Sequence, residues 1–194
     1  MVKARRCDWC GDDPLYVDYH DREWGAPVGD GRALFERLML EGMQAGLSWF
    51  TILKKRDHMR ARFFDFDPVA LAERGEGALE DWMTDPGIIR HRGKLEALIG
   101  NARATLALPE PFEEMIWRFV DSAPKQNRWR GPSQVPSTTA ESEAMSRALK
   151  RAGFRFVGPT ICYAFMQSAG LVNDHLTRCP RHVECAELAR GWSL

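Results

Sequence analysis

The sequence predicts an all-α fold in a single domain. Helix-start signals recur along the chain, apolar residues return at helical spacing, and stretches with the alternating pattern of strands are scarce. The length of 194 residues, with 44% hydrophobic and 28% charged residues, suits one compact core. We therefore treat residues 1–194 as one domain.

Three helices are expected in the first quarter of the chain. Asp13 followed by Pro14 is typical of an N-cap and a first helical position. The next helix is expected over residues 31–45, where apolar residues recur at three and four positions. Ser48 is a suitable N-cap for a third helix.

Further helices follow the same logic. Asp67 and Pro68 repeat the aspartate-proline signal, and the short helix that they open is expected to end before Gly87. We interpret Thr160 as the cap of a late apolar helix, although it could instead contact a ligand. The remaining helices are expected over residues 93–108, 111–120 and 141–151. The polar, proline-containing segment 124–139 is expected to be a surface loop.

Charge and cysteine content set limits on the class of protein. Lysines and arginines together number 27, as do aspartates and glutamates, so any anion-binding surface must come from local clustering. The basic start of the chain is not followed by an apolar run, and no stretch reaches the roughly 18 apolar residues of a membrane span. Five cysteines without an export signal favour reduced thiols or metal ligands. We expect a cytoplasmic protein without membrane contact.

Glu41 is the most unusual residue within a predicted helix. At about 100° per residue, it shares the apolar stripe that contains Leu34 and Leu38. Such a glutamate could sit at the edge of the core and reach solvent or an arginine. Alternatively, it could lie at the floor of a cavity and bind a ligand, with Trp49 beside it.

Cysteine and histidine cluster near both ends of the chain, which suggests a metal site. His175 and Cys179 are four residues apart and can reach one ion from consecutive helical turns. Spacing alone leaves the other two ligands of a tetrahedral site open. The candidates are Cys7, Cys10, His20, His182 and Cys185. Unrelated buried thiols and surface imidazoles are the alternative.

The segment GIIRHRGK, residues 87–94, is a candidate for contact with nucleic acid. It lies between two predicted helices, with a glycine near each end and four basic or imidazole side chains. Amides of a glycine turn beside a helix N-terminus can hold a phosphate without reading base sequence. An ordinary solvated turn would explain the same residues.

Four stretches of the chain together carry a specific resemblance. They are RCDWCGDDPLYVDYHDREWG, LFERLMLEGMQAGLSWFTILKKR, DPGIIRHRGKLEALIGNARA and RFVGPTICYAFMQSAGLVNDH. In this order, over about residues 6–179, they resemble 3-methyladenine DNA glycosylase I, a branch of the helix-hairpin-helix glycosylase superfamily. The resemblance implies a base-excision repair enzyme that hydrolyses the N-glycosidic bond and releases N3-methyladenine from alkylated double-stranded DNA. A monomer is expected.

The resemblance also implies where the metal and the DNA bind. A structural zinc ion would join segments 7–20 and 175–179, with ligands that fall on Cys7, His20, His175 and Cys179. The hairpin is expected over about residues 78–106. Its DNA contacts would come from Gly87, Arg90, Arg92, Gly93 and Lys94, while Gln44, Ala45 and Gly46 would fill the gap left by the extruded base. A small-residue turn demanded by packing would also explain the last three.

The base pocket that the resemblance implies consists mostly of aromatic residues. Its members would be Trp9, Tyr16, Tyr19, Trp24 and Trp49, with Glu41 as the catalytic residue that recognises the base. Methylation at N3 makes adenine cationic, so the leaving group needs little acid catalysis, and aromatic faces attract the cation. Many relatives in the wider superfamily have a catalytic aspartate soon after the hairpin. Here no aspartate follows GIIRHRGK before Asp121, so the resemblance implies base removal without strand cleavage.

Two other classes share some of these features. A non-catalytic, zinc-stapled helical DNA-binding module would need the metal site and the hairpin, but not an inward carboxylate beside Trp49. A zinc hydrolase would require an open coordination position. Four protein ligands would exclude the second alternative.

Overall fold

The structure, a computed structural model, describes residues 5–194. This part of the chain contains nine α-helices and two strands of two residues each, so the prediction of a mostly helical fold is confirmed. The helices are α1 (Pro14–Arg22), α2 (Gly31–Gln44), α3 (Trp49–Arg62), α4 (Pro68–Thr84), α5 (Arg92–Leu106), α6 (Phe112–Trp117), α7 (Ala140–Arg151), α8 (Pro159–Ser168) and α9 (Pro180–Arg190). The strands are β1 (Lys125–Gln126) and β2 (Val172–Asn173).

Three of the predicted N-caps are confirmed. The side chains of Asp13, Ser48 and Asp67 each accept a hydrogen bond from a backbone amide in the first turn of the following helix. These bonds satisfy amides that have no partner inside the helix. Proline occupies the first helical position after both aspartates, where its missing N–H costs no hydrogen bond.

The structure differs from the predictions at several places, and α9 lies in a stretch for which no helix is predicted. Thr160 is not a cap: it lies inside α8, which begins at Pro159 with Gly158 as its N-cap. The helix after Asp67 is not short, since α4 has 17 residues. Segment 124–139 is not only a surface loop, because it contains β1, which pairs in parallel with β2. Tertiary contacts that local patterns do not encode explain the last difference.

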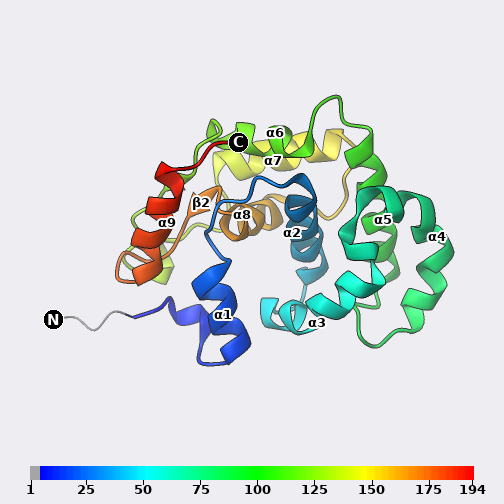
Figure 1. The fold of residues 1–194 in the computed structure, drawn as a ribbon, viewed down its shortest axis with the longest axis horizontal. Coiled ribbons are helices and arrows are strands. Elements are labelled where there is room, and N and C mark those ends of the chain that lie inside the picture. Colours follow the sequence, from blue (N-terminus) through cyan, green and yellow to red (C-terminus); the bar gives the residue numbers. More distant parts are fainter. Residues whose placement is uncertain (1–4) are drawn as a thin grey trace.

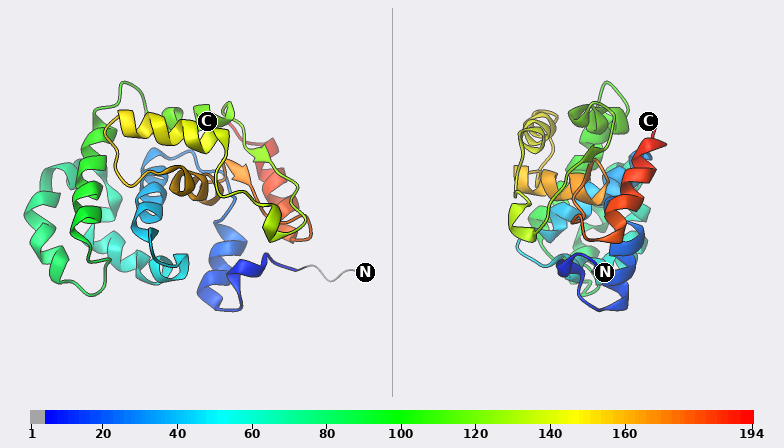
Figure 2. Two further views of the ribbon diagram at one scale, coloured as in Figure 1. Left: turned by 180° about the vertical axis from the view of Figure 1, so that it is seen from behind. Right: turned by 90° about the vertical axis from the view of Figure 1, so that its left-hand side faces the viewer.

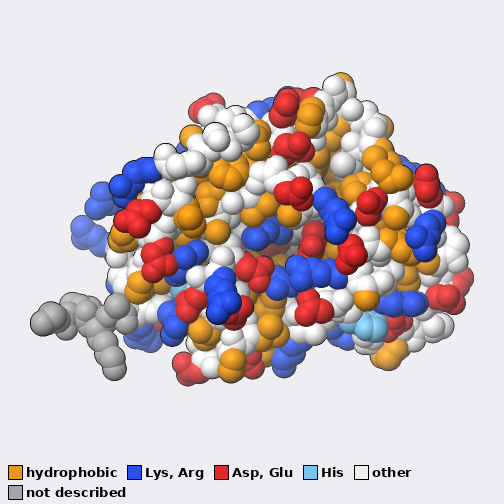
Figure 3. Space-filling model, viewed as in Figure 1, with side chains coloured by type: hydrophobic (Ala, Val, Ile, Leu, Met, Phe, Trp, Pro, Cys, Tyr) orange, Lys and Arg blue, Asp and Glu red, His pale blue; other side chains and the backbone are white. Residues whose placement is uncertain are grey.

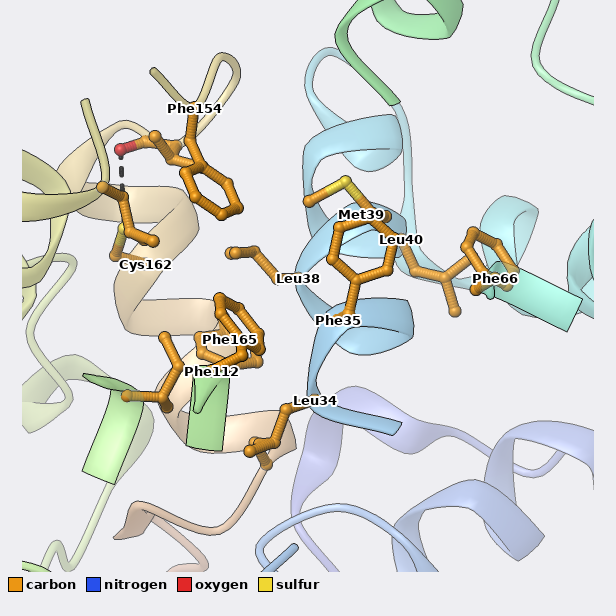
Figure 4. Close-up of a cluster of buried hydrophobic side chains, with 14 of the residues drawn as sticks. Leu34, Phe35, Leu38, Met39, Leu40, Phe66, Phe112, Phe154, Cys162 and Phe165 are labelled. Atoms are coloured by element: carbon orange, nitrogen blue, oxygen red, sulfur yellow. Dashed lines mark hydrogen bonds between the residues drawn. The ribbon is translucent and has the colours of Figure 1, made fainter. Parts of the chain in front are cut away.

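The core forms around α2, which is buried on most of its circumference. Leu34, Phe35 and Leu38 are fully buried on this helix, and Phe165 of α8 is fully buried beside them. Figure 4 shows these side chains between the two helices, with Phe112 closing one side. A helix with so many buried positions is a rigid support for any polar side chain that it carries.

The elements are distributed along the long axis of the molecule. The α4–α5 pair, joined by residues 85–91, lies at one end, and α9 lies at the other (Figures 1 and 2). α4 and α5 make the most extensive helix–helix contact of the described residues. Helix α1, near the N-terminus, follows the segment that approaches α9 and β2. The segment that precedes α1 and the residues just before α9 therefore lie side by side, away from the α4–α5 pair.

One face of the molecule carries charges of both signs without a large patch of either. Figure 3 shows lysine and arginine side chains interspersed with aspartate and glutamate over this face. The equal numbers of basic and acidic residues agree with this distribution. Among the described residues, no helix has both the length and the apolar composition needed to cross a bilayer.

Candidate functional site

A cavity of about 310 Å³ opens between α1, α2, α3 and α8. Its volume lies at the lower end of the range of roughly 300–1,000 Å³ for small-molecule sites. Six residues that the sequence indicated as pocket residues line it: Trp9, Tyr16, Tyr19, Trp24, Glu41 and Trp49. Gln44, predicted as part of a wedge, also lines it.

Glu41 projects from α2 into this cavity and is only 5% exposed. Burial raises the pKa of the Glu41 carboxyl to about 8, while Ser168 and the charge of Arg37 act in the opposite direction. Arg37, one turn earlier on α2, donates a hydrogen bond to the carbonyl of Ser168. The Glu41 carboxyl group therefore keeps its proton to a higher pH than an exposed glutamate, and a bound cation would favour its ionised form.

Aromatic rings form the walls around Glu41. The ring centroids of Tyr19 and Trp49 are 5.3 Å apart, and those of Trp9 and Trp24 are 5.0 Å apart. Trp9 is 38% exposed and lies at the mouth of the cavity. The indole N–H of Trp49 is buried and has no hydrogen-bond partner among the described residues. A flat, polarizable ligand with a polar edge would fit this combination.

Asp174 is a functional candidate that sequence reasoning missed. It is 2% exposed, lines the cavity, and accepts four hydrogen bonds of 2.6–2.8 Å. The donors are Asn127, Trp129, Tyr163 and Gln167. Its position in the quoted stretch GLVNDH, directly before the predicted ligand His175, was the available signal.

Segment 124–139 forms part of the cavity wall. Pro132 and Val135 line the cavity, and the indole N–H of Trp129 donates to Asp174 at 2.8 Å. The backbone carbonyl of Trp129 accepts from the amide of Thr177. These contacts attach the segment to the chain around β2, so the loop predicted from composition has a defined position beside the site.

The predicted wedge lies at the end of α2. Ala45 and Gly46 are exposed, and Gly46 has a φ of +82°, which only glycine adopts without strain. Gln44 is partly buried and points toward the cavity. The turn is thus a surface feature next to the pocket mouth.

The hairpin residues differ in their surroundings. Arg90 is exposed, whereas the guanidinium of Arg92 donates to Glu80 at 2.8 and 2.9 Å. Gly87 donates its amide to the carboxylate of Asp85. Lys94 departs from the prediction of a phosphate contact, because its ammonium is directed inward onto backbone carbonyls.

Residues from the first and last quarters of the chain form a compact group of metal-ligating side chains. The ligand atoms of Cys7, His20, His175 and Cys179 all lie within 4.8 Å of one another, and all four residues are buried. Cys179 Sγ is 3.6 Å from His20 Nε2 and 3.8 Å from His175 Nδ1. The structure therefore brings together the ligand set that the resemblance implied, and this set could hold a metal ion.

The other thiols and the remaining imidazole of this region are used differently. Cys10 is buried and donates its thiol to the carbonyl of Cys7. His182 is hydrogen bonded through Nε2 to the carbonyl of Asn127, and Cys185 is buried on α9. None of the three belongs to the group of four.

Comparison with known proteins agrees with this geometry. The family model described as methyladenine glycosylase matches residues 9–182, which is most of the chain. The chain belongs to the methyladenine glycosylase family. Among curated relatives, it is 53% identical over 177 residues to "DNA-3-methyladenine glycosylase 1" of Escherichia coli (strain K12), covering 90% of this chain and 95% of that protein.

Solved structures of the family have the same fold. A crystal structure of 3-methyladenine DNA glycosylase I superimposes with a TM-score of 0.89 at 52% identity, covering 91% of this chain and 98% of the other. A glycosylase of this type from Staphylococcus aureus, studied for its recognition of 3-methyladenine, gives a TM-score of 0.87 at 37% identity, with coverages of 90% and 94%. The methyladenine glycosylase fold thus accounts for nearly the whole chain.

Proposed function

We propose that this protein removes 3-methyladenine from alkylated double-stranded DNA by hydrolysing the N-glycosidic bond, as the first step of base-excision repair. The observation that carries the proposal is Glu41, a buried carboxyl group in an aromatic cavity of about 310 Å³. The names of the relatives support it, since proteins at 50% and 53% identity are DNA-3-methyladenine glycosylases.

The chemistry of the substrate matches the cavity. N3 methylation makes the base cationic, which weakens its bond to the sugar, so that strong acid catalysis is unnecessary. The faces of Tyr19 and Trp49 can attract the cation. Binding of the cationic base favours the ionised form of Glu41, which can then accept a hydrogen bond from the exocyclic amine of adenine. Guanine has a carbonyl at this position and cannot donate that bond.

Access to the base requires extrusion of the nucleotide from the duplex. Unstacking and unpairing cost a few kcal/mol, which protein contacts must offset. We assign the backbone contacts to the hairpin, with Arg90 as its most available cation, and the filling of the vacated stack to residues 44–46. Water then attacks a sugar centre with oxocarbenium character. The cavity-lining residues of the described chain include no lysine to attack that centre, which supports base removal without strand cleavage.

The cysteine and histidine group fits a structural zinc ion. With Zn–S near 2.3 Å and Zn–N near 2.1 Å, tetrahedral sulfur and nitrogen ligands lie about 3.6 Å apart. Three of the four sulfur-to-nitrogen pairs, at 3.6, 3.7 and 3.8 Å, are close to this value. Zinc with four protein ligands would have a stabilising role only, by joining the chain ends.

Hydrogen bonds around the four residues support the same assignment. The second ring nitrogen of His20 is 2.7 Å from Asp21 Oδ1, and that of His175 donates to the carbonyl of Trp24 at 2.9 Å. Metal-bound histidines commonly have such a partner, which fixes the ring orientation. The backbone amide of Leu176 also donates to Cys7 Sγ at 3.4 Å.

Analysis of the released products tests the proposed activity. The purified protein, which we expect to be a monomer, is incubated with duplex DNA treated with a methylating agent, and both the free bases and the strands are separated. Release of 3-methyladenine with intact strands is the expected result. A non-catalytic DNA-binding module would retain the DNA and release no base, which would refute the proposal.

A further inference from the structure

Lys94 is buried in the first turn of α5, with its side chain directed away from solvent. The residue is 7% exposed, and its ammonium donates to the carbonyl of Met43 at 2.8 Å and to that of Ala45 at 2.6 Å. Both acceptors belong to the end of α2 and the turn after it. One side chain therefore connects two elements that are about 50 residues apart in the sequence.

These contacts suit the chemistry at the end of a helix. The last carbonyls of α2 lack partners within the helix and carry its partial negative charge. A lysine is rarely buried unless its ammonium is paired, and burial lowers the pKa of Lys94. Because this ammonium gives up most of its hydration for two carbonyls, loss of either partner would leave a buried polar group unsatisfied.

Lys94 is also tied to the hairpin through its own backbone. The imidazole of His91, in the turn between α4 and α5, accepts a hydrogen bond from the Lys94 amide at 3.2 Å. At the end of α2, Gln44 lies between the two residues whose carbonyls accept from Lys94, Met43 and Ala45, and it lines the cavity. Glu41 is one turn earlier on α2. Lys94 thus lies between the proposed phosphate contact and the proposed wedge.

We infer that Lys94 is a positioning residue that holds the 44–46 turn at a fixed place relative to the hairpin, so that binding of the backbone by the hairpin directs this turn into the base stack. This inference rests on the proposed function. It assigns Lys94 to extrusion of the nucleotide rather than to phosphate binding or to recognition of the base. Misplacement of a positioning group by about 1 Å can cost about 100-fold in rate.

The test separates extrusion from base binding with three measurements on Lys94→Met, which keeps the apolar stem and removes the charge. They are single-turnover release of 3-methyladenine from methylated duplex, affinity for free 3-methyladenine, and fluorescence of 2-aminopurine placed beside an uncleavable 3-methyl-3-deazaadenine in a duplex. We expect release to fall about 10- to 100-fold. The fluorescence rise on binding should shrink, and free-base affinity should stay within about twofold.

Matched variants make the result specific. Arg103→Gln removes one positive charge from the same helix, at an exposed pair with Glu76, and should leave all three measurements unchanged. Lys94→Arg should restore part of the fluorescence rise. If Lys94→Met does not fold, as judged by its melting transition, Lys94→Gln replaces it because its amide can still donate to one carbonyl.

The outcomes that overturn the inference are distinct from failure of the proposed function. Normal release by Lys94→Met, or a parallel loss of release and free-base affinity, would show that Lys94 does not position the turn. Absence of 3-methyladenine release by the unmodified protein would instead refute the proposed function itself.

Discussion

His20 and His175, which are 155 positions apart in the chain, lie edge to face with ring centroids 4.8 Å apart and planes at 89°. Their ring nitrogens face Cys7 and Cys179, so α1 and the segment after β2 converge on one point. Trp24 also packs edge to face against His175, at 4.6 Å, and lines the cavity. The proposed zinc site and the proposed base site therefore share a wall.

Loss of one proposed zinc ligand should release the metal and destabilise the protein. We expect Cys179→Ser to contain less than one equivalent of zinc and to melt at a lower temperature, since a site formed only in the folded state contributes its binding energy to folding. Metal analysis and thermal unfolding measure this. Cys10→Ser is the matched control, because Cys10 is buried nearby but lies outside the group of four. Equal zinc contents in both variants would contradict the assignment.

Replacing the cavity carboxyl group should abolish most of the proposed activity. Glu41→Gln keeps the size of the side chain but removes the acceptor charge that favours a cationic base. We expect excision to fall about 100-fold or more, as is typical when one preorganised electrostatic contact is lost. Affinity for undamaged duplex should stay within about twofold. An excision rate close to that of the unmodified protein would remove Glu41 from the mechanism.

The same substitution should change the pH dependence of stability. The pKa of Glu41 is about 8 in the folded protein, whereas an exposed glutamate, as in the unfolded chain, has a pKa of 4.5. Between these two pH values the folded state therefore binds more protons than the unfolded state. The contribution of Glu41 to stability is present below pH 4.5 and is lost as the pH rises through 8. In urea unfolding experiments, the free energy of unfolding of Glu41→Gln should rise by about 1–4 kcal/mol relative to that of the unmodified protein as the pH increases from 5 to 8. A constant difference would contradict this.

The hydrogen-bond network of Asp174 should contribute to stability. Tyr163→Phe removes the 2.6 Å bond from the phenol to a buried carboxylate. Hydrogen bonds to charged groups contribute about 1.5–3 kcal/mol, so denaturant unfolding should show a loss of this size. Since Tyr163 does not line the cavity, a change in free-base affinity is not expected. An unchanged free energy of unfolding would mean that another donor replaces the phenol.

Arg90 should contribute to DNA binding through phosphate contact alone. We expect Arg90→Ala to weaken binding to duplexes of different sequence by similar factors and to reduce the salt dependence of binding by about one counterion. Titrations at several salt concentrations measure both effects. Arg103→Gln again serves as a control of equal charge change, at an exposed ion pair. Identical salt dependence in all three proteins would exclude Arg90 from the interface.

Much of the fold could be predicted because its signals are local. An aspartate before a proline starts α1 and α4 through its own side chain and the fixed geometry of proline, whatever the rest of the chain does. The position of Glu41 on a buried stripe also follows from helical period. The start of α8 was predicted wrongly: two possible starts lie within three residues, and the helix begins at the proline, Pro159, with Gly158 as the N-cap instead of Thr160.

The sequence by itself determined most of the helices (though not α9), the inward carboxyl group of Glu41 and, through its resemblance, the family. Only the tertiary structure decided which groups from distant segments meet. In the tertiary structure, Asp174 accepts hydrogen bonds from four donors, and segment 124–139 forms part of the cavity wall. Lys94, predicted to contact a phosphate, instead donates to backbone carbonyls at the end of α2. Helix signals act over a few residues, whereas these contacts depend on how complete helices pack, which no local pattern encodes.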